Sequence, residues 1–322
     1  MNNAQFIFIF LGLIAVFVFS ILLRDTFSFD VRFFRFFPLP WIVQKDPEPL
    51  HKKALEKLSQ QEKLDADFQE NLDQKMKNSG LNILFFSDLH AETLPLSSRR
   101  LVKRISQLDA DYLLFGGDLS SGPSGIEKGL QIIRKIRKAK GDAWIIGVRG
   151  NHDAYLKQER AQAAGLILLE NQSVFIRDNE GQVWQIVGTC DLRSGFFDLA
   201  KALQSAHPLS PLPFQDVPRE RRIFLSHNPD AVLENLAQSC AYFLSGHFHG
   251  GQIRLPFRLE MRNLRQDQLC KRHKIYDSVF IYKNILGFIS RGIGCVLLPF
   301  RFRACAELTM IHFDDAFPAK KS

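Results

Sequence analysis

Cysteine is scarce in this 322-residue chain, and the five cysteines are scattered, with no C-x-x-C pair among them. An odd number of isolated cysteines fits neither a disulfide framework nor a zinc knuckle. The chain also lacks internal repeats and low-complexity tracts, so it does not have the pattern of a solenoid. These absences favour a globular protein in a reducing compartment.

Acidic residues are outnumbered by basic ones. Lysine and arginine total 42 against 34 aspartates and glutamates, which gives a formal net charge of +8. Such an excess predicts an anionic partner: a nucleic acid, an acidic membrane surface or a phosphorylated substrate. Apolar residues make up 46% of the chain. This is enough to fill the core of one large α/β domain, or of one domain with a smaller appendage.

A long hydrophobic run lies near the N-terminus. Residues 6–23 contain no charged side chain over 18 positions, at the short end of the length that crosses a bilayer as a helix. No basic residue precedes the run and no small-x-small cleavage site follows it, so we expect an uncleaved anchor rather than a cleaved signal peptide. Basic residues follow at Arg24, Arg32, Arg35 and Lys45. The positive-inside rule then leaves the rest of the chain in the cytoplasm.

Two segments separate this run from the remainder of the chain. Residues 27–41 interleave aromatic side chains with Arg32 and Arg35, a composition typical of the lipid headgroup layer. A core strand of the globular domain is the alternative. Residues 50–77 place apolar side chains at helical spacing, which predicts an amphipathic helix. The predicted organisation is a membrane anchor (1–24), an interfacial segment with a helical linker (25–79) and a globular domain (80–316).

From residue 81 onward, short apolar runs alternate with helical patterns. Apolar runs of four to seven residues are typical of buried strands, and their alternation with helices predicts an α/β fold. The predicted strands are residues 81–87, 112–117, 144–148, 183–189, 222–226 and 242–246, and the predicted helices lie near residues 98–108 and 125–139.

Metal-capable residues come directly after five of these strands. Because ligands bind at the carboxyl ends of strands in layered α/β folds, we expect the five blocks to meet at one edge of the sheet. Carboxylates mixed with imidazoles suit manganese, iron or zinc, and the absence of cysteine argues against a structural zinc site. The blocks are Ser87-Asp88-Leu89-His90, Gly116-Gly117-Asp118, Gly150-Asn151-His152-Asp153, Ser226-His227-Asn228 and Gly246-His247-Phe248-His249.

Each block alone is a weak signal, but together they use five of the nine histidines, and each closes a predicted strand. Agreement of every motif with its expected structural context makes coincidence a poor explanation. With these motifs the sequence resembles the calcineurin-like metallophosphoesterase family over about residues 81–313. The resemblance rests on D-x-H, G-D, G-N-H-D, a lone histidine after a strand, and G-H-x-H followed by Gly250-Gly251-Gln252.

The resemblance implies a two-layer β-sandwich flanked by helices, with a dinuclear metal centre at the strand ends. It also implies phosphoester hydrolysis with two divalent ions, for which we expect Mn²⁺, with iron or zinc as alternatives. The implied ligands of one metal are Asp88, His90, Asp118 and His249, and those of the other are Asp118, Asn151, His227 and His247.

Further roles come from residues beside these motifs. In the family, the histidine that matches His152 stabilises the transition state or protonates the leaving oxygen. Asp153 either orients that imidazole or caps the next helix. Arg149 and Arg193 are candidates to contact a substrate phosphate, although a surface salt bridge is the commoner fate of a loop arginine. Phe248 stands where related sequences often have a small polar residue, and we expect it at the rim of the site.

The region after the last motif is strongly basic. Residues 254–274 carry seven lysines and arginines against Glu260 and Asp267, and Arg254 is our candidate for substrate binding in this run. A solvated charged face is the alternative. Beside a membrane, such a run would attract anionic headgroups or a nucleotide diphosphate.

Within the family, the motifs resemble a branch of small, often membrane-associated bacterial phosphodiesterases. We therefore expect a single-pass protein of the bacterial inner membrane with its catalytic domain on the cytoplasmic side. The expected partners are an anionic membrane surface and a phosphorylated lipid or nucleotide-sugar lipid, without nucleic acid. The expected reaction is hydrolysis of UDP-2,3-diacylglucosamine to UMP and 2,3-diacylglucosamine 1-phosphate in lipid A biosynthesis. The alternatives are a general phosphodiesterase or phosphatase and a non-catalytic scaffold, although scaffold members usually lose ligands.

Overall fold

Two six-stranded sheets pack face to face in the computed structural model, which describes residues 3–36 and 80–314. The predicted amphipathic helix 50–77 lies outside the described residues. One sheet has the order β1 (Phe29–Phe36), β12 (Ala306–Phe313), β2 (Leu81–Phe86), β3 (Tyr112–Phe115), β4 (Ile145–Gly147), β5 (Leu166–Leu168). The other has the order β10 (Ser278–Tyr282), β11 (Ile285–Ile289), β9 (Tyr242–Ser245), β8 (Arg222–Leu225), β7 (Val183–Gly188), β6 (Gln172–Arg177).

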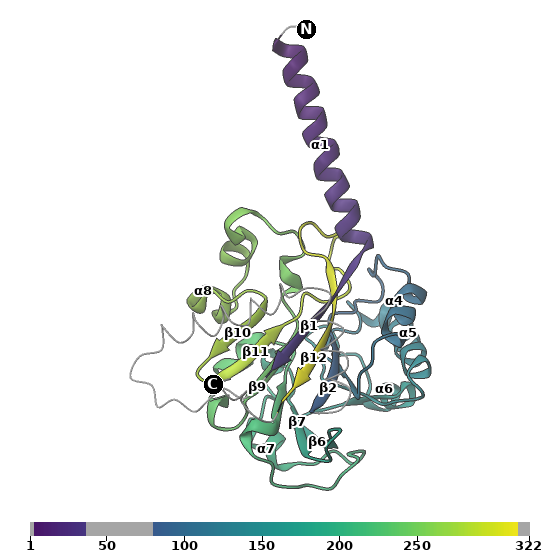
Figure 1. The fold of residues 1–322 in the computed structure, drawn as a ribbon, viewed down its shortest axis with the longest axis vertical. Helices are drawn as coiled ribbons and strands as arrows, with labels where there is room; N and C mark the ends of the chain where they lie inside the picture. Colours follow the sequence, from purple (N-terminus) through teal and green to yellow (C-terminus); the bar gives the residue numbers. More distant parts are fainter. Residues whose placement is uncertain (1–2, 37–79, 315–322) are drawn as a thin grey trace, which may run out of the picture.

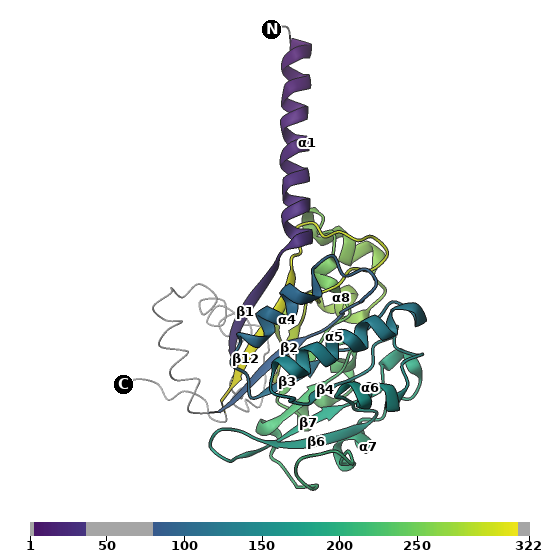
Figure 2. The ribbon, with the colours of Figure 1, turned by 90° about the vertical axis from the view of Figure 1, so that its right-hand side faces the viewer.

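Helices cover the outer faces of both sheets (Figures 1 and 2). The first sheet is covered by α4 (Ser98–Ser106), α5 (Ile126–Ala139) and α6 (Gln158–Ala164), whose buried apolar side chains join the same cluster as the outer face of β2. The second sheet is covered by α7 (Leu199–Gln204) and α8 (Gln268–His273). The fold is therefore the α/β two-layer sandwich flanked by helices that the sequence predicts.

Strand β2 shows why its apolar run is continuous. Leu84 and Phe86 face the helices on one side of the sheet, whereas Ile83 and Phe85 face the second sheet. Both faces of the strand are thus removed from water, so alternation with polar residues would leave unpaired polar groups in the core. On one side β2 pairs in parallel with β3, and on the other it pairs in antiparallel with β12.

Strand β1 corrects the predicted domain boundary. Residues 29–36 pair in parallel with β12 along their whole length, and Phe34 and Phe36 are buried between the sheets. Instead of binding lipid phosphates, Arg32 pairs with Glu307 and Arg35 with Asp314. The prediction that residues 25–79 form an interfacial linker is therefore wrong for 29–36. Aromatic residues are typical both of an edge strand that other parts of the protein cover and of a segment in the lipid headgroup layer. Composition alone therefore does not separate the two.

Helix α1 (Asn3–Phe27) projects from the domain beside the start of β1 (Figures 1 and 2). Its Phe10–Phe27 part is long and apolar enough to cross a membrane. Most side chains in this part are exposed, among them Leu13, Val16 and Phe17. The helix therefore contributes little to the core and leaves an apolar surface without a covering element in the described part of the chain.

Candidate metal centre

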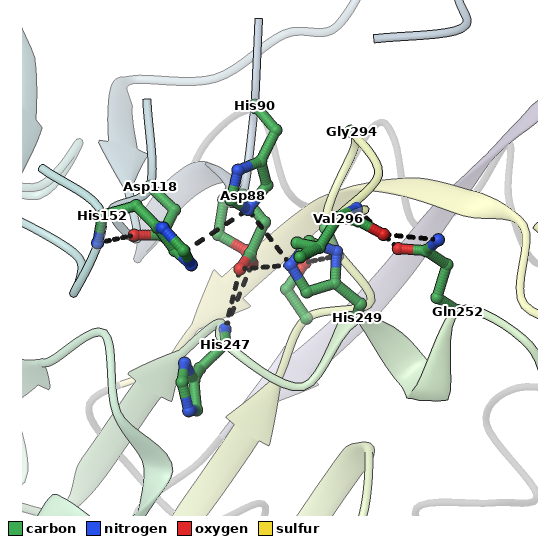
Figure 3. Close-up of polar contacts among 12 residues, drawn as sticks. Asp88, His90, Asp118, His152, His247, His249, Gln252, Gly294 and Val296 are labelled. Carbon is green, nitrogen blue, oxygen red and sulfur yellow. Dashed lines mark hydrogen bonds and ion pairs between the residues drawn. The ribbon is translucent and has the colours of Figure 1, made fainter. Parts of the chain in front are cut away.

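The five polar blocks come together, although from two sheets instead of one. Three follow β2, β3 and β4 of the first sheet, and two follow β8 and β9 of the second. The expectation of a single sheet edge is therefore wrong. Blocks from the two sheets nevertheless meet: His249, which follows β9, lies next to Asp88, which follows β2 (Figure 3).

One cluster joins Asp88, His90 and His249, and all three side chains are buried. The Nε2 atom of His249 lies 3.2 Å from Asp88 Oδ1 and 3.2 Å from His90 Nε2. The ligand-capable atoms of the cluster all lie within 4.8 Å of one another. These are three of the four ligands that the family resemblance implies for one metal ion, and the fourth is Asp118.

The second cluster joins Asp118, His227 and His247, again all buried. His227 Nε2 lies 3.2 Å from Asp118 Oδ2 and 3.2 Å from His247 Nδ1. Asn151 Oδ1 is 3.2 Å from the same His227 nitrogen. The Asp118 Oδ2 atom is also 3.5 Å from His90 Nε2 of the first cluster, so Asp118 stands between the two.

These donor atoms suit two divalent cations. In each cluster an imidazole nitrogen faces another imidazole nitrogen, with a carboxylate oxygen close to one of them. Such lone pairs repel one another unless a proton or a cation lies between them. Nitrogen and carboxylate donors without sulfur are the ligands of manganese, iron and catalytic zinc sites. The residues present therefore fit the dinuclear centre that the sequence predicts.

The carboxylates stay ionised despite their burial. Burial opposes the charged form of Asp118, but the His227 imidazole holds the pKa of Asp118 below its ordinary value. Burial also opposes a charged His227, yet Asp118 raises the pKa of His227 to about 10. Two other imidazoles are neutral, because burial lowers the pKa of His90 to about 3 and that of His247 to about 4. Ionised carboxylates and neutral imidazoles are the forms that bind metal ions, so metal binding would release the proton that His227 otherwise carries.

The backbone of the site is held in sparsely populated conformations. Five residues of the two clusters have φ in the left-handed region, with values between 36° and 73°. Side chains other than glycine adopt this region at a cost, which persists only where the surroundings enforce it. The five are Asp88, His90, Asp118, His247 and His249.

Asp153 has neither of the two roles that the sequence suggests. Its buried carboxylate accepts hydrogen bonds from the backbone N–H groups of Asp118 (2.8 Å), Leu119 (2.9 Å) and Gly150 (2.9 Å). It does not cap a helix, since α6 begins only at Gln158. Asp153 instead ties the loop after β3 to the loop after β4, and so fixes Asp118 relative to Asn151.

His152 lines a cavity of about 240 Å³ together with Asp118, Asn151 and His247. Its backbone N–H donates to Asp118 Oδ1 at 2.9 Å, and its ring centre is 5.4 Å from that of His90. The imidazole therefore borders the cavity that members of both clusters line.

The three candidate substrate-binding arginines differ in position. Arg193 lines the cavity. Arg149 instead pairs with Glu170 at 2.5 Å, and Arg254 pairs with Asp277 at 2.5 Å. Neither of these two is among the residues that line the cavity in the described chain.

Two residues of the basic run reach the site without having been singled out from the sequence. The Asp267 carboxylate lies 3.5 Å from His247 Nε2 and also pairs with Arg193 at 2.5 Å. Arg265 donates to the His247 carbonyl at 2.8 Å and lines the cavity. A neighbouring cavity of about 530 Å³ is lined by Arg193, Asp230, Arg265, Gln266 and Asp267. The net charge of the run is visible in the sequence, but the fold decides which members face the metal clusters.

Phe248 is among the residues that line the site cavity, as expected, but its side chain is fully buried instead of exposed at the rim. It belongs to the core cluster under the second sheet, and the Arg265 guanidinium lies 4.9 Å from the centre of its ring. The Phe248 ring therefore packs against the Arg265 guanidinium in a cation–π contact.

Comparison with known proteins agrees with this fold. The family profile for calcineurin-like phosphoesterases matches residues 81–251. The chain is 30% identical to the phosphodiesterase YaeI of Escherichia coli (strain K12), over 71% of this chain and 81% of that protein. It is 28% identical to the uncharacterized metallophosphoesterase YkoQ of Bacillus subtilis (strain 168), over 71% of this chain and 82% of that protein.

A shorter match joins the chain to the UDP-2,3-diacylglucosamine pyrophosphatase LpxG of Chlamydia muridarum (strain MoPn / Nigg). It is 32% identical over 132 residues, which are 39% of this chain and 35% of that protein. The fold and the paired clusters define a metal-dependent phosphoesterase. The chain belongs to the calcineurin-like metallophosphoesterase family.

Proposed function

We propose that this protein is a membrane-anchored pyrophosphatase that hydrolyses UDP-2,3-diacylglucosamine to UMP and 2,3-diacylglucosamine 1-phosphate. The observation that carries the proposal is the link through Arg301 between the clusters and the apolar helix that can span a membrane. The Arg301 backbone N–H donates to Thr26 Oγ1 of α1, and its guanidinium donates to the carbonyl of the cluster residue His249. The partial match to a pyrophosphatase for this substrate supports it.

The metal ligands in this proposal are the six residues of the two clusters and Asn151. When bound, two divalent cations, Mn²⁺ in our proposal, would activate water for attack and neutralise charge on the phosphate oxygens. Asp118 stands between the clusters and would be shared by both ions. His152 borders the same cavity and would donate a proton to the leaving oxygen.

The substrate diphosphate would be received by the arginines around the cavity. Arg193 and Arg265 share one carboxylate, that of Asp267, so the group of three keeps a net positive charge. Arginine binds phosphate oxygens in a bidentate manner. The neighbouring cavity that these residues line would accommodate the nucleotide part of the substrate.

The location follows from α1 and the charges after it. We propose a bacterial inner-membrane protein with a single span and a cytoplasmic catalytic domain, because Arg24 follows the apolar run. Protease added to intact spheroplasts should spare residues 80–322. Digestion of the domain under these conditions would place it on the opposite side.

The substrate is tested by side-by-side assays of purified full-length protein with Mn²⁺. We expect rapid hydrolysis of UDP-2,3-diacylglucosamine and weak hydrolysis of UDP-N-acetylglucosamine, which lacks the acyl chains. Expression should also rescue a bacterial strain that lacks its own enzyme for this step. Equal activity on both sugar nucleotides would contradict the proposed substrate.

A general phosphodiesterase is the second candidate, because the match to the phosphodiesterase YaeI covers 81% of that protein. It would use the same clusters but would not need acyl chains. Hydrolysis of bis(p-nitrophenyl) phosphate at a rate equal to that of the lipid substrate would favour this candidate.

A further inference from the structure

Two loops expose large apolar side chains at the end of the domain from which α1 emerges. Phe257 is 84% exposed and Leu297 is 91% exposed. Their neighbours Leu255, Leu259 and Leu298 are exposed as well. Single exposed apolar residues are common, but a group of this size on adjoining loops indicates an interaction surface. We call these five residues the apolar tips.

The backbone makes the choice of residue at these tips more unusual. Phe257 has φ of 56° and Leu297 has φ of 63°. Glycine or asparagine adopts this left-handed region at much lower cost than a bulky side chain. For phenylalanine and leucine the left-handed φ is unfavourable, and because both side chains are exposed, no burial within the described chain offsets this cost. A contact outside the described chain is therefore needed to account for both.

The two loops are joined to each other. The Gln252 side chain donates to the carbonyls of Val296 (3.1 Å) and Leu298 (2.9 Å), and its oxygen accepts from the Val296 N–H at 2.7 Å. Further along, the Arg254 N–H donates to the Phe302 carbonyl at 2.9 Å. The apolar tips thus move with one structural unit.

The same unit is tied to the base of α1. The Arg301 N–H donates to Thr26 Oγ1 at 2.9 Å, and the Arg303 N–H donates to the buried Asp25 carboxylate at 2.5 Å. Figures 1 and 2 both show the loop before β12 next to the domain end of α1. A bilayer crossed by α1 would therefore meet this end of the domain.

The metal cavity lies directly behind the tips. Gln252 and Val296 line the cavity that contains Asp118 and His249, and Figure 3 shows both next to His249. Leu297, the next residue along the chain, points to the outside. The loop that carries Val296 and Leu297 therefore separates the cavity from the apolar tips.

We propose that the apolar tips insert into the bilayer that holds α1 and hold the mouth of the metal cavity against the lipid headgroups. A lipid-linked phosphoester then reaches the clusters while its acyl chains stay in the bilayer. The proposal rests on the anchoring role proposed above for α1, and it identifies the docking surface of the catalytic domain.

Charges around the tips suit an anionic bilayer. Arg24, Arg262 and Arg303 are exposed in the segments that carry or flank the apolar tips. The nearby acids Asp25 and Glu260 are buried and take part in hydrogen bonds or ion pairs within the protein. Exposed basic residues at the membrane surface attract anionic lipids. Apolar side chains inside a basic rim are typical of interfacial membrane binding.

The test uses full-length protein in nanodiscs of phosphatidylcholine and phosphatidylglycerol, with and without brominated acyl chains. Phe257→Trp and Leu297→Trp each place a fluorescent reporter at a tip. Phe214→Trp is the matched control, because Phe214 is an exposed aromatic that packs on Phe175 of β6, at the end opposite α1. Emission is measured as the difference from the unsubstituted protein.

We expect brominated lipid to remove most of the added emission from both tip variants and little from the control. Unquenched tips in protein that remains in the nanodisc would overturn the docking proposal while leaving the anchor intact. Loss of the unsubstituted protein from the disc would instead refute the anchor. Hydrolysis of UDP-2,3-diacylglucosamine, measured on the same samples, reports the proposed function separately.

Discussion

The metal clusters and the apolar tips both use strained backbone, but in opposite surroundings. Asp88 and Asp118 have left-handed φ in buried positions, where neighbouring groups hold the conformation. Phe257 and Leu297 have similar φ values in full exposure. In the first case the described protein provides the compensating contacts. In the second case it does not. The metal clusters are therefore held by the protein itself, whereas the apolar tips require a contact from outside the described chain.

The largest effect should come from removing the residue shared by the clusters. We expect Asp118→Ala to reduce hydrolysis to background and to lower the bound metal from about two ions per chain, because one carboxylate serves both sites. Metal analysis and a phosphodiester assay measure the two effects. Asp216→Asn is the matched control, since Asp216 is an exposed carboxylate paired only with Arg222 in the described chain. Unchanged metal content in the alanine variant would contradict the bridging assignment.

Changing His152 should separate proton transfer from metal binding at the same cavity. His152→Ala is expected to keep both metal ions and to lower kcat by roughly 10²–10⁴-fold, as for the loss of a positioned general acid. A substrate with a good leaving group such as p-nitrophenolate needs less protonation, so the defect should be smaller with it. Loss of bound metal from the alanine variant would instead make His152 a metal ligand.

Removal of a buried aromatic side chain, Phe36, should destabilise the protein far more than removal of an exposed one at the tips, Phe257. Phe36 of β1 is fully buried between the sheets, and Phe36→Ala should destabilise the domain by about 3–5 kcal/mol. Phe257→Ala should change stability by less than about 0.5 kcal/mol in detergent, because Phe257 is exposed. Chemical denaturation of both variants in the same micelles measures the difference. Equal stability losses would show that the tip is packed in the folded protein.

A smaller effect is expected from the carboxylate that holds His247. Asp267→Asn removes the charge that faces His247 Nε2 and pairs with Arg193. Losses of this kind typically cost about 10–100-fold in metal affinity or activity. Titration with Mn²⁺ should show weaker binding, and Asp267→Glu should restore part of it. If affinity is unchanged and only KM rises, Asp267 acts through the arginines instead.

The sequence alone predicted the part of the fold that depends on local pattern. The strands at residues 81–87, 112–117 and 242–246 and the helix near 125–139 are all present in the structure. Each is a continuous apolar run or a helical repeat, and both features can be read within a short window. The metal-capable blocks could be found for the same reason, since each directly follows such a strand.

Only the tertiary structure decided which segments far apart in the sequence contact one another. The aromatic residues of 29–36 could be buried by lipid or by protein, and only pairing with β12, nearly 280 positions away, selects protein. Asp267 and Arg265 meet His247 because α8 packs under the second sheet. The apolar tips flank the cavity because Gln252 holds the 296–300 loop. Long-range packing sets these contacts, and residue pattern within one segment carries no information about which distant segment will cover it.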